Sequence, residues 1–262
     1  MSRQNYYKTR KKREWQAVDE VLIKRLVLDE RSSQPRLGGR KLLKILRPKL
    51  KRYGIAIGRD RFFKVLKNQG LLLEKLRFLP RTTNSYHNLP VFLNRVKDRE
   101  LTGSNQVWAA DITYVRKRDT FMYLSLITDM YSRKIVGYHL GASLDTAETL
   151  KALQMALRGK PKDAQPIHHS DRGCQYCSHD YVRALEKSGL GVSMTEQNHC
   201  CENALAERVN GILKQEYGLS YSFKNAVQMH RAIKQAVWLY NTRRPHCSLG
   251  LETPEHVHQM AA

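Results

Sequence analysis

Apolar residues in the front part of the chain recur at helical spacing among many cations. Residues 15–30 predict an amphipathic helix whose core-facing stripe contains Trp15, Val18, Val21, Leu22 and Leu26. Two shorter helices are predicted over residues 38–50 and 59–70, with a glycine-containing break between them. We expect Asp60 to cap the second short helix at its start and Gly70 to close it.

From residue 106 onwards the pattern changes to short apolar runs rich in β-branched residues. Three such runs, at 107–115, 120–130 and 134–143, are separated by short turns and predict an antiparallel meander. The remaining elements are predicted as a helix at 146–159, a strand at 166–170, a helix at 181–189, a strand at 190–195, and helices near 203–217 and 225–242. This order predicts a mixed α/β domain with helices packed on a sheet.

Basic charge is concentrated in the front part of the chain. The formal net charge is +22, and residues 1–100 carry 27 Lys and Arg against 9 Asp and Glu, a net of +18. Residues 101–262 carry 19 against 15, a net of +4. Because Lys and Arg replace counterions on phosphates, the excess favours a polyanionic partner over a merely solvated basic surface. We expect a basic arm and DNA-binding module at 1–76, a turn-rich linker at 77–105 and a second domain at 106–262.

The two short helices are typical of a helix-turn-helix, in which the second helix enters a groove of DNA. Small helical hairpins also occur without DNA, but the surrounding charge favours the DNA-binding interpretation. The candidate DNA contacts on the second helix are Arg59, Arg61, Lys64 and Lys67.

Five cysteines, and no signal-like apolar stretch near the start, favour a reducing cytoplasm. No segment approaches the ~18 consecutive apolar residues that a membrane helix needs. Cys174 and Cys177, together with the pair at 200–201 and the adjacent histidine, have poor spacing for one tetrahedral zinc site, so free thiols are favoured over zinc.

Three acidic residues are the main candidates for chemistry. Asp111 lies within a mostly apolar strand, where ligation of a metal or pairing with an arginine would offset the cost of burying its charge. Asp171 follows another strand, at an end where α/β folds expose ligand-binding residues, although it is equally suited to starting a turn. Glu207 shares one helical face with Asn203 and Lys214, a face that would be ordinary solvated surface without this context.

These residues lie in segments that resemble a known family. Residues 108–114 (WAADITY), 169–176 (HSDRGCQY) and 203–216 (NALAERVNGILKQE) are similar to the three acidic motifs of insertion-sequence transposases, in particular the OrfB protein of the IS-three family within the retroviral-integrase superfamily. The resemblance extends to 129–137 (DMYSRKIVG) and 240–250 (YNTRRPHCSLG), and upstream to the helix-turn-helix and linker. One departure is a glutamate at position 202, where the family usually has aspartate.

The resemblance implies an RNase-H-like fold in which Asp111, Asp171 and Glu207 are catalytic and hold two Mg²⁺ or Mn²⁺ ions. It implies cleavage and joining of DNA strands at the terminal inverted repeats, with target DNA as the second substrate. A catalytically inactive or domesticated DNA-binding regulator is the alternative. A tyrosine recombinase would not require the three carboxylates.

Supporting roles follow from the same resemblance and from position. Lys214, Arg243 and Arg244 are candidate DNA contacts, and His169 and Asn203 are candidate supporting residues near the metal. For Lys214 an exposed helix lysine, and for His169 a structural histidine, remain open alternatives. We expect a homo-oligomer on DNA, an upstream OrfA-type protein as a fusion or partner, and a location in the bacterial cytoplasm, associated with the nucleoid.

Overall fold

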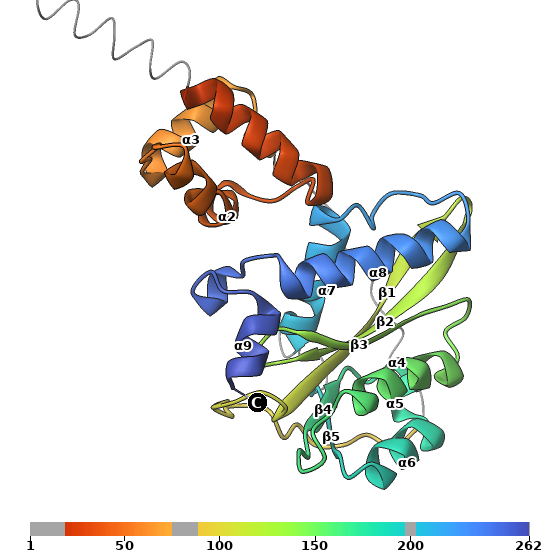
Figure 1. Cartoon of the computed structure of the whole chain (residues 1–262). Coiled ribbons are helices and arrows are strands. Elements are labelled where there is room, and N and C mark those ends of the chain that lie inside the picture. Colours follow the sequence, from red (N-terminus) through yellow and green to blue (C-terminus); the bar gives the residue numbers. More distant parts are fainter. Residues whose placement is uncertain (1–18, 75–88, 197–202, 262) are drawn as a thin grey trace, which may run out of the picture. The chain divides into compact units, whose positions relative to one another are not determined.

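The computed structural model describes residues 19–74, 89–196 and 203–261 (Figure 1). The chain divides into two compact units. Unit 1 comprises Met1–Arg77 with Pro245–Leu251, and unit 2 comprises Phe78–Arg244 with Glu252–Ala262. Within the described ranges, every helix is too short or too polar to pass through a lipid bilayer.

Unit 1 contains helical residues 19–33, followed by α2 (Gly39–Arg52) and α3 (Arg59–Asn68). The three helices bury one apolar core, whose fully enclosed side chains include Ile23, Val27, Leu42, Leu46 and Phe62. The predicted pair of short helices is therefore present, as the second and third helices of a small all-α module.

The first helix buries the predicted stripe only in part, with Leu22 and Leu26 packed against the core. Ile23 and Val27 are fully buried, whereas Val21 is 69% exposed; Trp15 and Val18 lie outside the described residues. A run of neighbouring apolar residues is compatible with more than one stripe, and packing against the other two helices selects Ile23 and Val27.

The two ends of α3 give different outcomes for the predicted N-cap and the predicted C-terminal glycine. Asp60 makes no cap bond; Gly58 is the N-cap residue, and Asp60 instead lies in the first turn and pairs with Arg59 at 2.9 Å. The predicted cap is therefore wrong. Gly70 has φ +65°, and the backbone N–H of Leu71 reaches back to the Leu66 carbonyl at 2.7 Å. This glycine-dependent closure is the predicted one.

Unit 2 is built on a five-stranded sheet in the order β3-β2-β1-β4-β5. Its strands are β1 (Val107–Lys117), β2 (Thr120–Asp129), β3 (Ile135–Gly141), β4 (Ile167–Ser170) and β5 (Gly191–Met194). The first three form the predicted antiparallel meander, and β4 and β5 are added in parallel beside β1.

Helices cover both faces of this sheet, as the mixed α/β prediction requires (Figure 1). One face packs against α4 (Thr146–Arg158), α5 (Cys174–Cys177) and α6 (His179–Lys187). The other packs against α7 (Ala204–Glu216) and α8 (Ala226–Thr242). The chain continues through a short 3-10 turn (Cys247–Leu249) to α9 (Pro254–Met260).

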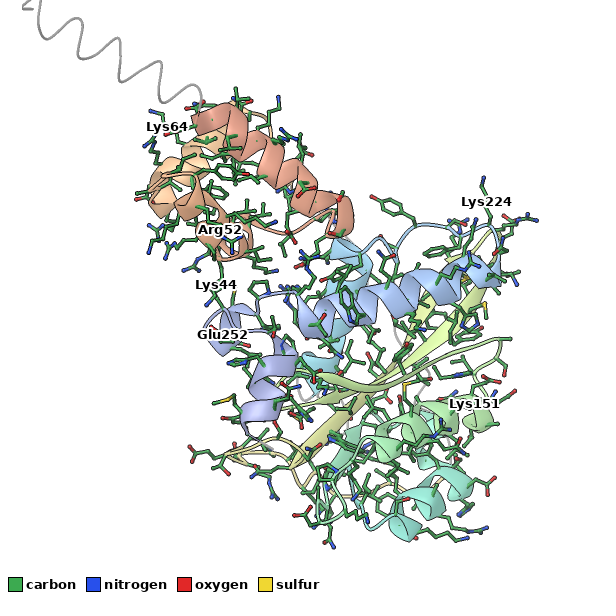
Figure 2. The ribbon with its side chains drawn as sticks, in the orientation of Figure 1. Lys44, Arg52, Lys64, Lys151, Lys224 and Glu252 are labelled. Carbon is green, nitrogen blue, oxygen red and sulfur yellow. The ribbon has the colours of Figure 1, made fainter. Side chains whose placement is uncertain are left out.

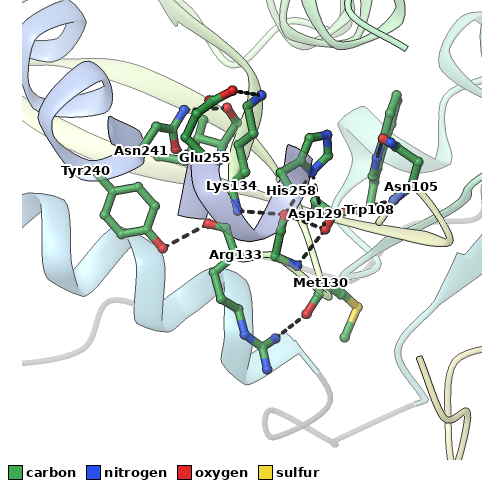
Figure 3. Close-up of polar contacts among 12 residues, drawn as sticks. Asn105, Trp108, Asp129, Met130, Arg133, Lys134, Tyr240, Asn241, Glu255 and His258 are labelled. Atoms are coloured by element: carbon green, nitrogen blue, oxygen red, sulfur yellow. Dashed lines mark hydrogen bonds and ion pairs between the residues drawn. The ribbon is translucent and has the colours of Figure 1, made fainter. Parts of the chain in front are cut away.

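A buried carboxylate fixes the turn after β2 (Figure 3). Asp129 accepts hydrogen bonds from the backbone N–H and hydroxyl of Ser132 at 2.7 and 2.6 Å, and from the Asn105 N–H at 2.7 Å. His258 of α9 lies 2.9 Å from the same hydroxyl. Burial works to raise the pKa of Asp129, but the His258 imidazole, with Nδ1 3.8 Å from Oδ1 of Asp129, and the hydrogen bonds from Ser132 and Asn105 outweigh it and hold that pKa below its ordinary value.

Candidate active site

The pairing of β1 with β4 brings Asp111 and Asp171 together. Ala109 is paired with His169, and the same parallel register continued by two residues sets Asp111 opposite Asp171, one residue beyond β4. The backbone N–H of Gly173 donates to Oδ1 of Asp171 at 3.1 Å and so fixes this carboxylate at the strand end. Two acidic residues separated by 59 others in sequence thus become neighbours across one strand pair.

The electrostatics of Asp111 reflect this neighbourhood. Its pKa is raised to about 7, first by burial, then by the charge of Asp171, with a smaller contribution from Glu207. Hydrogen bonds from Asn210 and from the Ile112 backbone N–H act in the opposite direction. Because like charges close together disfavour ionisation, the pair of carboxylates is suited to a cation.

Helix α7 supplies the remaining candidates from one face. Asn210 donates from Nδ2 to Oδ2 of Asp111 at 2.6 Å, and Asn203 donates from Nδ2 to the Ala110 carbonyl at 3.1 Å. Within the described part of the chain, the buried Oδ1 atoms of both asparagines have no hydrogen-bond partner. Glu207, between them, is exposed in the first turn of the helix.

Lys214 lies one turn beyond Asn210 and is half-buried. Burial lowers its pKa, while the charge of Asp111 raises it. The face of α7 that the helical spacing predicts is therefore present, and its residues Asn203 and Asn210 contact β1. Across residues 19–74, 89–196 and 203–261, no group of three His, Cys, Asp or Glu side chains stands at metal-binding distances.

His169 is buried in β4, two residues before Asp171, with Nδ1 2.9 Å from the Ser193 hydroxyl of β5. Its neighbour His168 faces the opposite side, where Nε2 lies 3.0 Å from the Tyr181 hydroxyl. Burial lowers the pKa of His168 to about 3, so that this imidazole is neutral. Ser193 had no sequence signal of its own, because only strand pairing places it beside His169.

The candidate DNA contacts on α3 are exposed side chains: Arg59, Arg61, Lys64 and Lys67. Figure 2 labels Lys64 among them. Arg59 pairs with Asp60, and Arg61 pairs with Asp19 at 3.3 Å. In unit 2, Arg243 is exposed at the C-terminal end of α8.

Arg244, in contrast, is a structural residue, and its expected role as a DNA contact is contradicted by its burial. Its side chain is 2% exposed and forms two hydrogen bonds with Glu216 at 2.7 and 2.8 Å. The guanidinium also lies over the Tyr240 ring, 5.7 Å from the centroid. This ion pair ties the end of α7 to the end of α8.

Cysteines at 174, 177 and 247 form no disulfide bond. Cys177 is buried with Sγ 3.5 Å from the Met194 sulfur, and Cys174 and Cys247 are exposed. The second cysteine pair considered for zinc, at 200–201, lies outside the described residues.

The mixed sheet with helices on both faces, with one carboxylate on β1 and a second just beyond the end of the adjacent β4, defines an integrase core of the RNase-H-like class. Two family models described as "Integrase core domain" match residues 102–200 and 188–254. A chain of the simian T-cell lymphotropic virus intasome, solved in complex with PP2A regulatory subunit B56 gamma, has the same fold, with a TM-score of 0.53 and 21% identity over 84% of this chain and 74% of that chain.

Two relatives in sequence identify the family to which this integrase core belongs. The insertion element IS600 uncharacterized 31 kDa protein of Shigella sonnei is 41% identical over 223 residues, which is 83% of this chain and 82% of the relative. Transposase InsF for insertion sequence IS3A of Escherichia coli (strain K12) is 33% identical over 192 residues, 72% of this chain and 67% of the relative. The chain belongs to the IS3 family of insertion-sequence transposases, within the retroviral-integrase superfamily.

Proposed function

We propose that this transposase cleaves and joins DNA strands at the ends of its insertion element, with Asp111, Asp171 and Glu207 as its catalytic, metal-binding carboxylates. The observation that carries the proposal is the placement of Asp111 beside Asp171, where burial and their mutual repulsion raise the pKa of Asp111 to about 7. Such a pair is costly in a protein that has no cation to bind there.

The chemistry of the candidate ligands supports binding of a pair of divalent ions. All the candidate ligands are oxygen donors, which suit Mg²⁺ or Mn²⁺, and the buried Oδ1 atoms of Asn203 and Asn210 add acceptors without partners among the described residues. Asp111, Asp171 and Glu207 would hold the ions. When bound, two such ions activate an attacking oxygen and stabilise the leaving oxygen of a phosphodiester.

The protein's own side chains position these carboxylates and the substrate. Asn210 fixes one oxygen of Asp111, and the Gly173 N–H fixes Asp171. Lys214, on the same face of α7 and within the electrostatic reach of Asp111, would contact a phosphate of the reacting strand. Water as the nucleophile gives cleavage with a free 3′-OH, and that hydroxyl as the nucleophile gives strand transfer.

DNA is held mainly by the first 76 residues in this proposal. The exposed cations of α3 give the helix-turn-helix a basic face, and residues 77–105 link this module to the catalytic domain at 106–262. Arg243 adds a further contact, and His169 supports Asp171 through β4.

Assembly is part of the same proposal. Synapsis of two element ends requires a homo-oligomer on DNA, and an OrfA-type upstream protein would act as a fusion or partner in the nucleoid of a bacterial cell. Sizing the protein with and without DNA that carries the element ends tests the first point; a monomer on paired ends would contradict it.

A strand-transfer assay with Mg²⁺ tests the catalytic assignment. Asp111→Asn, Asp171→Asn and Glu207→Gln should each abolish joining while DNA binding is retained. Arg158→Ala, at the exposed C-terminal end of α4, is the control and should join strands normally. Unchanged joining in any of the three acidic variants would refute the assignment, and DNA binding without joining in the wild-type protein would favour a regulator.

A further inference from the structure

The outer part of the β1–β2 hairpin carries a group of aromatic and basic side chains, of which Arg116 and Phe121 are exposed and Tyr114 and Tyr123 are half-buried. Residues are paired as Tyr114 with Tyr123 and Arg116 with Phe121, so all four side chains point from the same face of the hairpin. Tyr114 makes edge-to-face contacts with Phe121 and Tyr123, with ring centroids 6.1 and 5.2 Å apart. Together, the side chains of Tyr114, Arg116, Phe121 and Tyr123 form the aromatic face of the hairpin.

Among the described residues, the two faces of the hairpin differ in what covers them. Val115 and Met122 point the other way and pack in the core beneath α7 and α8. Helices α4 to α6 pack over Trp108, Ala110 and Ile127, farther along the strands. On the aromatic face, Arg116 is exposed and Phe121 is 37% exposed. Part of the Phe121 ring is therefore accessible to solvent next to a cation.

Backbone hydrogen bonds hold this region in shape. The Arg118 N–H donates to the Phe223 carbonyl at 3.1 Å, and the Phe223 N–H donates to the Arg116 carbonyl at 3.0 Å. Figure 1 shows the loop before α8 beside the end of the hairpin. Lys224, labelled in Figure 2, is the residue after Phe223 in this loop. The aromatic face therefore lies on a hairpin whose end is held by hydrogen bonds to the loop before α8.

Charge identifies the kind of partner. The hairpin end and this loop contain the cations Arg116, Lys117, Arg118 and Lys224 and the single acid Asp119, a net of +3 from 4 − 1. Aromatic rings interleaved with cations are typical of surfaces that bind single-stranded nucleic acid, where bases stack on the rings and phosphates bind the cations. A duplex offers few base faces for stacking, since its bases cover one another.

We propose that the aromatic face of the hairpin binds an unpaired stretch of DNA strand, with a base stacked on Phe121 and a phosphate held by Arg116. The inference rests on the proposed function only in taking DNA as the ligand. It assigns to unit 2 a strand-binding surface separate from the carboxylates, formed by the hairpin end.

Photo-crosslinking of the full chain tests this binding mode directly. Phe121→p-benzoylphenylalanine is irradiated with labelled oligothymidylate, alongside the same replacement of Met155, which is 39% exposed on α4. We expect the adduct with DNA at 121 to exceed that at 155 severalfold. Equal yields, or a crosslink from 121 to a second protein chain in place of DNA, would overturn the proposal.

Binding measurements separate the stacking from the charge. Phe121→Ala should weaken oligothymidylate binding about 5-fold or more, and this loss should vanish with an abasic strand of equal length. Arg116→Glu should make the dependence of log K on log salt shallower by about one unit or more, whereas Arg158→Glu should leave it unchanged. An equal loss for both strands in Phe121→Ala, with unaltered folding by circular dichroism, would refute stacking.

These experiments need no divalent ion and are repeated in Asp111→Asn. Their failure would leave strand joining unaffected, and failure of the catalytic assignment would leave the crosslink at 121 unaffected. The two proposals therefore fail independently.

Discussion

Asn210 of α7 donates a hydrogen bond from Nδ2 to Oδ2 of Asp111 of β1 over 2.6 Å. The bond joins the helix that carries Glu207 to the strand that carries Asp111, and it opposes the effects of burial and of Asp171 on the pKa of Asp111. One amide side chain thus sets both the orientation of a carboxylate and the distance between two elements of the proposed active site.

Removal of this amide should weaken metal-dependent strand transfer more than it weakens the fold. Groups that orient metal ligands typically contribute about 10- to 100-fold to metal affinity or activity. We therefore expect Asn210→Ala to lower strand transfer by that factor at low Mg²⁺ and to recover partly at high Mg²⁺. A titration of joining against Mg²⁺ concentration measures this, with Gln215→Ala on the same helix as the control. A loss that is the same at every Mg²⁺ concentration would contradict a positioning role.

The ion pair between Glu216 and Arg244 should be a major contributor to the stability of unit 2. Arg244 is 2% exposed and Glu216 is 16% exposed, so Glu216→Gln leaves a buried guanidinium without its counter-charge. Such a change costs about 3–5 kcal/mol, compared with about 1 kcal/mol or less for an exposed pair.

The measurement is urea unfolding followed by circular dichroism. Lys97→Ala, which breaks the exposed pair of Lys97 with Glu196, is the control in the same unit. Equal losses of unfolding free energy in the two variants would show that the buried pair stabilises the fold no more than the exposed pair. Strand transfer by Glu216→Gln at low temperature, where the fold is intact, should remain close to that of the wild-type protein.

The sequence alone predicts the elements of unit 2 because their signals are local. β-branched runs and helical spacing are properties of neighbouring residues, and the motif that contains Asp171 ends a strand in both the prediction and the structure. The predicted face of α7, with Asn203, Glu207 and Lys214, is also local, since it depends only on helical periodicity.

Long-range pairing is what the sequence could not supply. Asn210 and Asp111 are 99 residues apart, and Arg244 and Glu216 are 28 apart, so no spacing rule connects them. The sequence predicts that Arg244 contacts DNA, because it lies beside Arg243 in a basic motif; only tertiary packing distinguishes the buried arginine from the exposed one. The choice of Ile23 over Val21 as a core residue has the same origin.

Asp129 should make the stability of unit 2 depend on pH in the acidic range. Its pKa is lowered in the folded state, so its contribution is fully present above the ordinary Asp value of about 3.9 and is lost as pH falls through the lower folded value. Hydrogen bonds to a charged group contribute about 1.5–3 kcal/mol, which sets the expected cost of Asp129→Asn at neutral pH.

Unfolding free energies of the wild-type protein and Asp129→Asn, measured from neutral pH to below pH ~3, should converge as the pH falls. Asp180→Asn, a change at an exposed residue in the first turn of α6, should show no such convergence. A constant difference between the wild-type protein and Asp129→Asn over the whole range would mean that the carboxylate charge is not the stabilising feature.

Lys64 on α3 provides the clearest test of the DNA-binding module. Its side chain is exposed, and no ion pair to it is found among the described residues, unlike Arg59 and Arg61. Because Lys64→Ala removes one ammonium group that would bind a phosphate, it should weaken duplex binding about equally for all sequences and make the dependence of log K on log salt shallower by about one unit. Fluorescence anisotropy over a series of salt concentrations measures both, with Lys24→Ala on the first helix as the control. If the two variants give the same slope as the wild-type protein, α3 does not bind the DNA backbone through Lys64, and the groove-binding helix must be sought elsewhere in the basic front half.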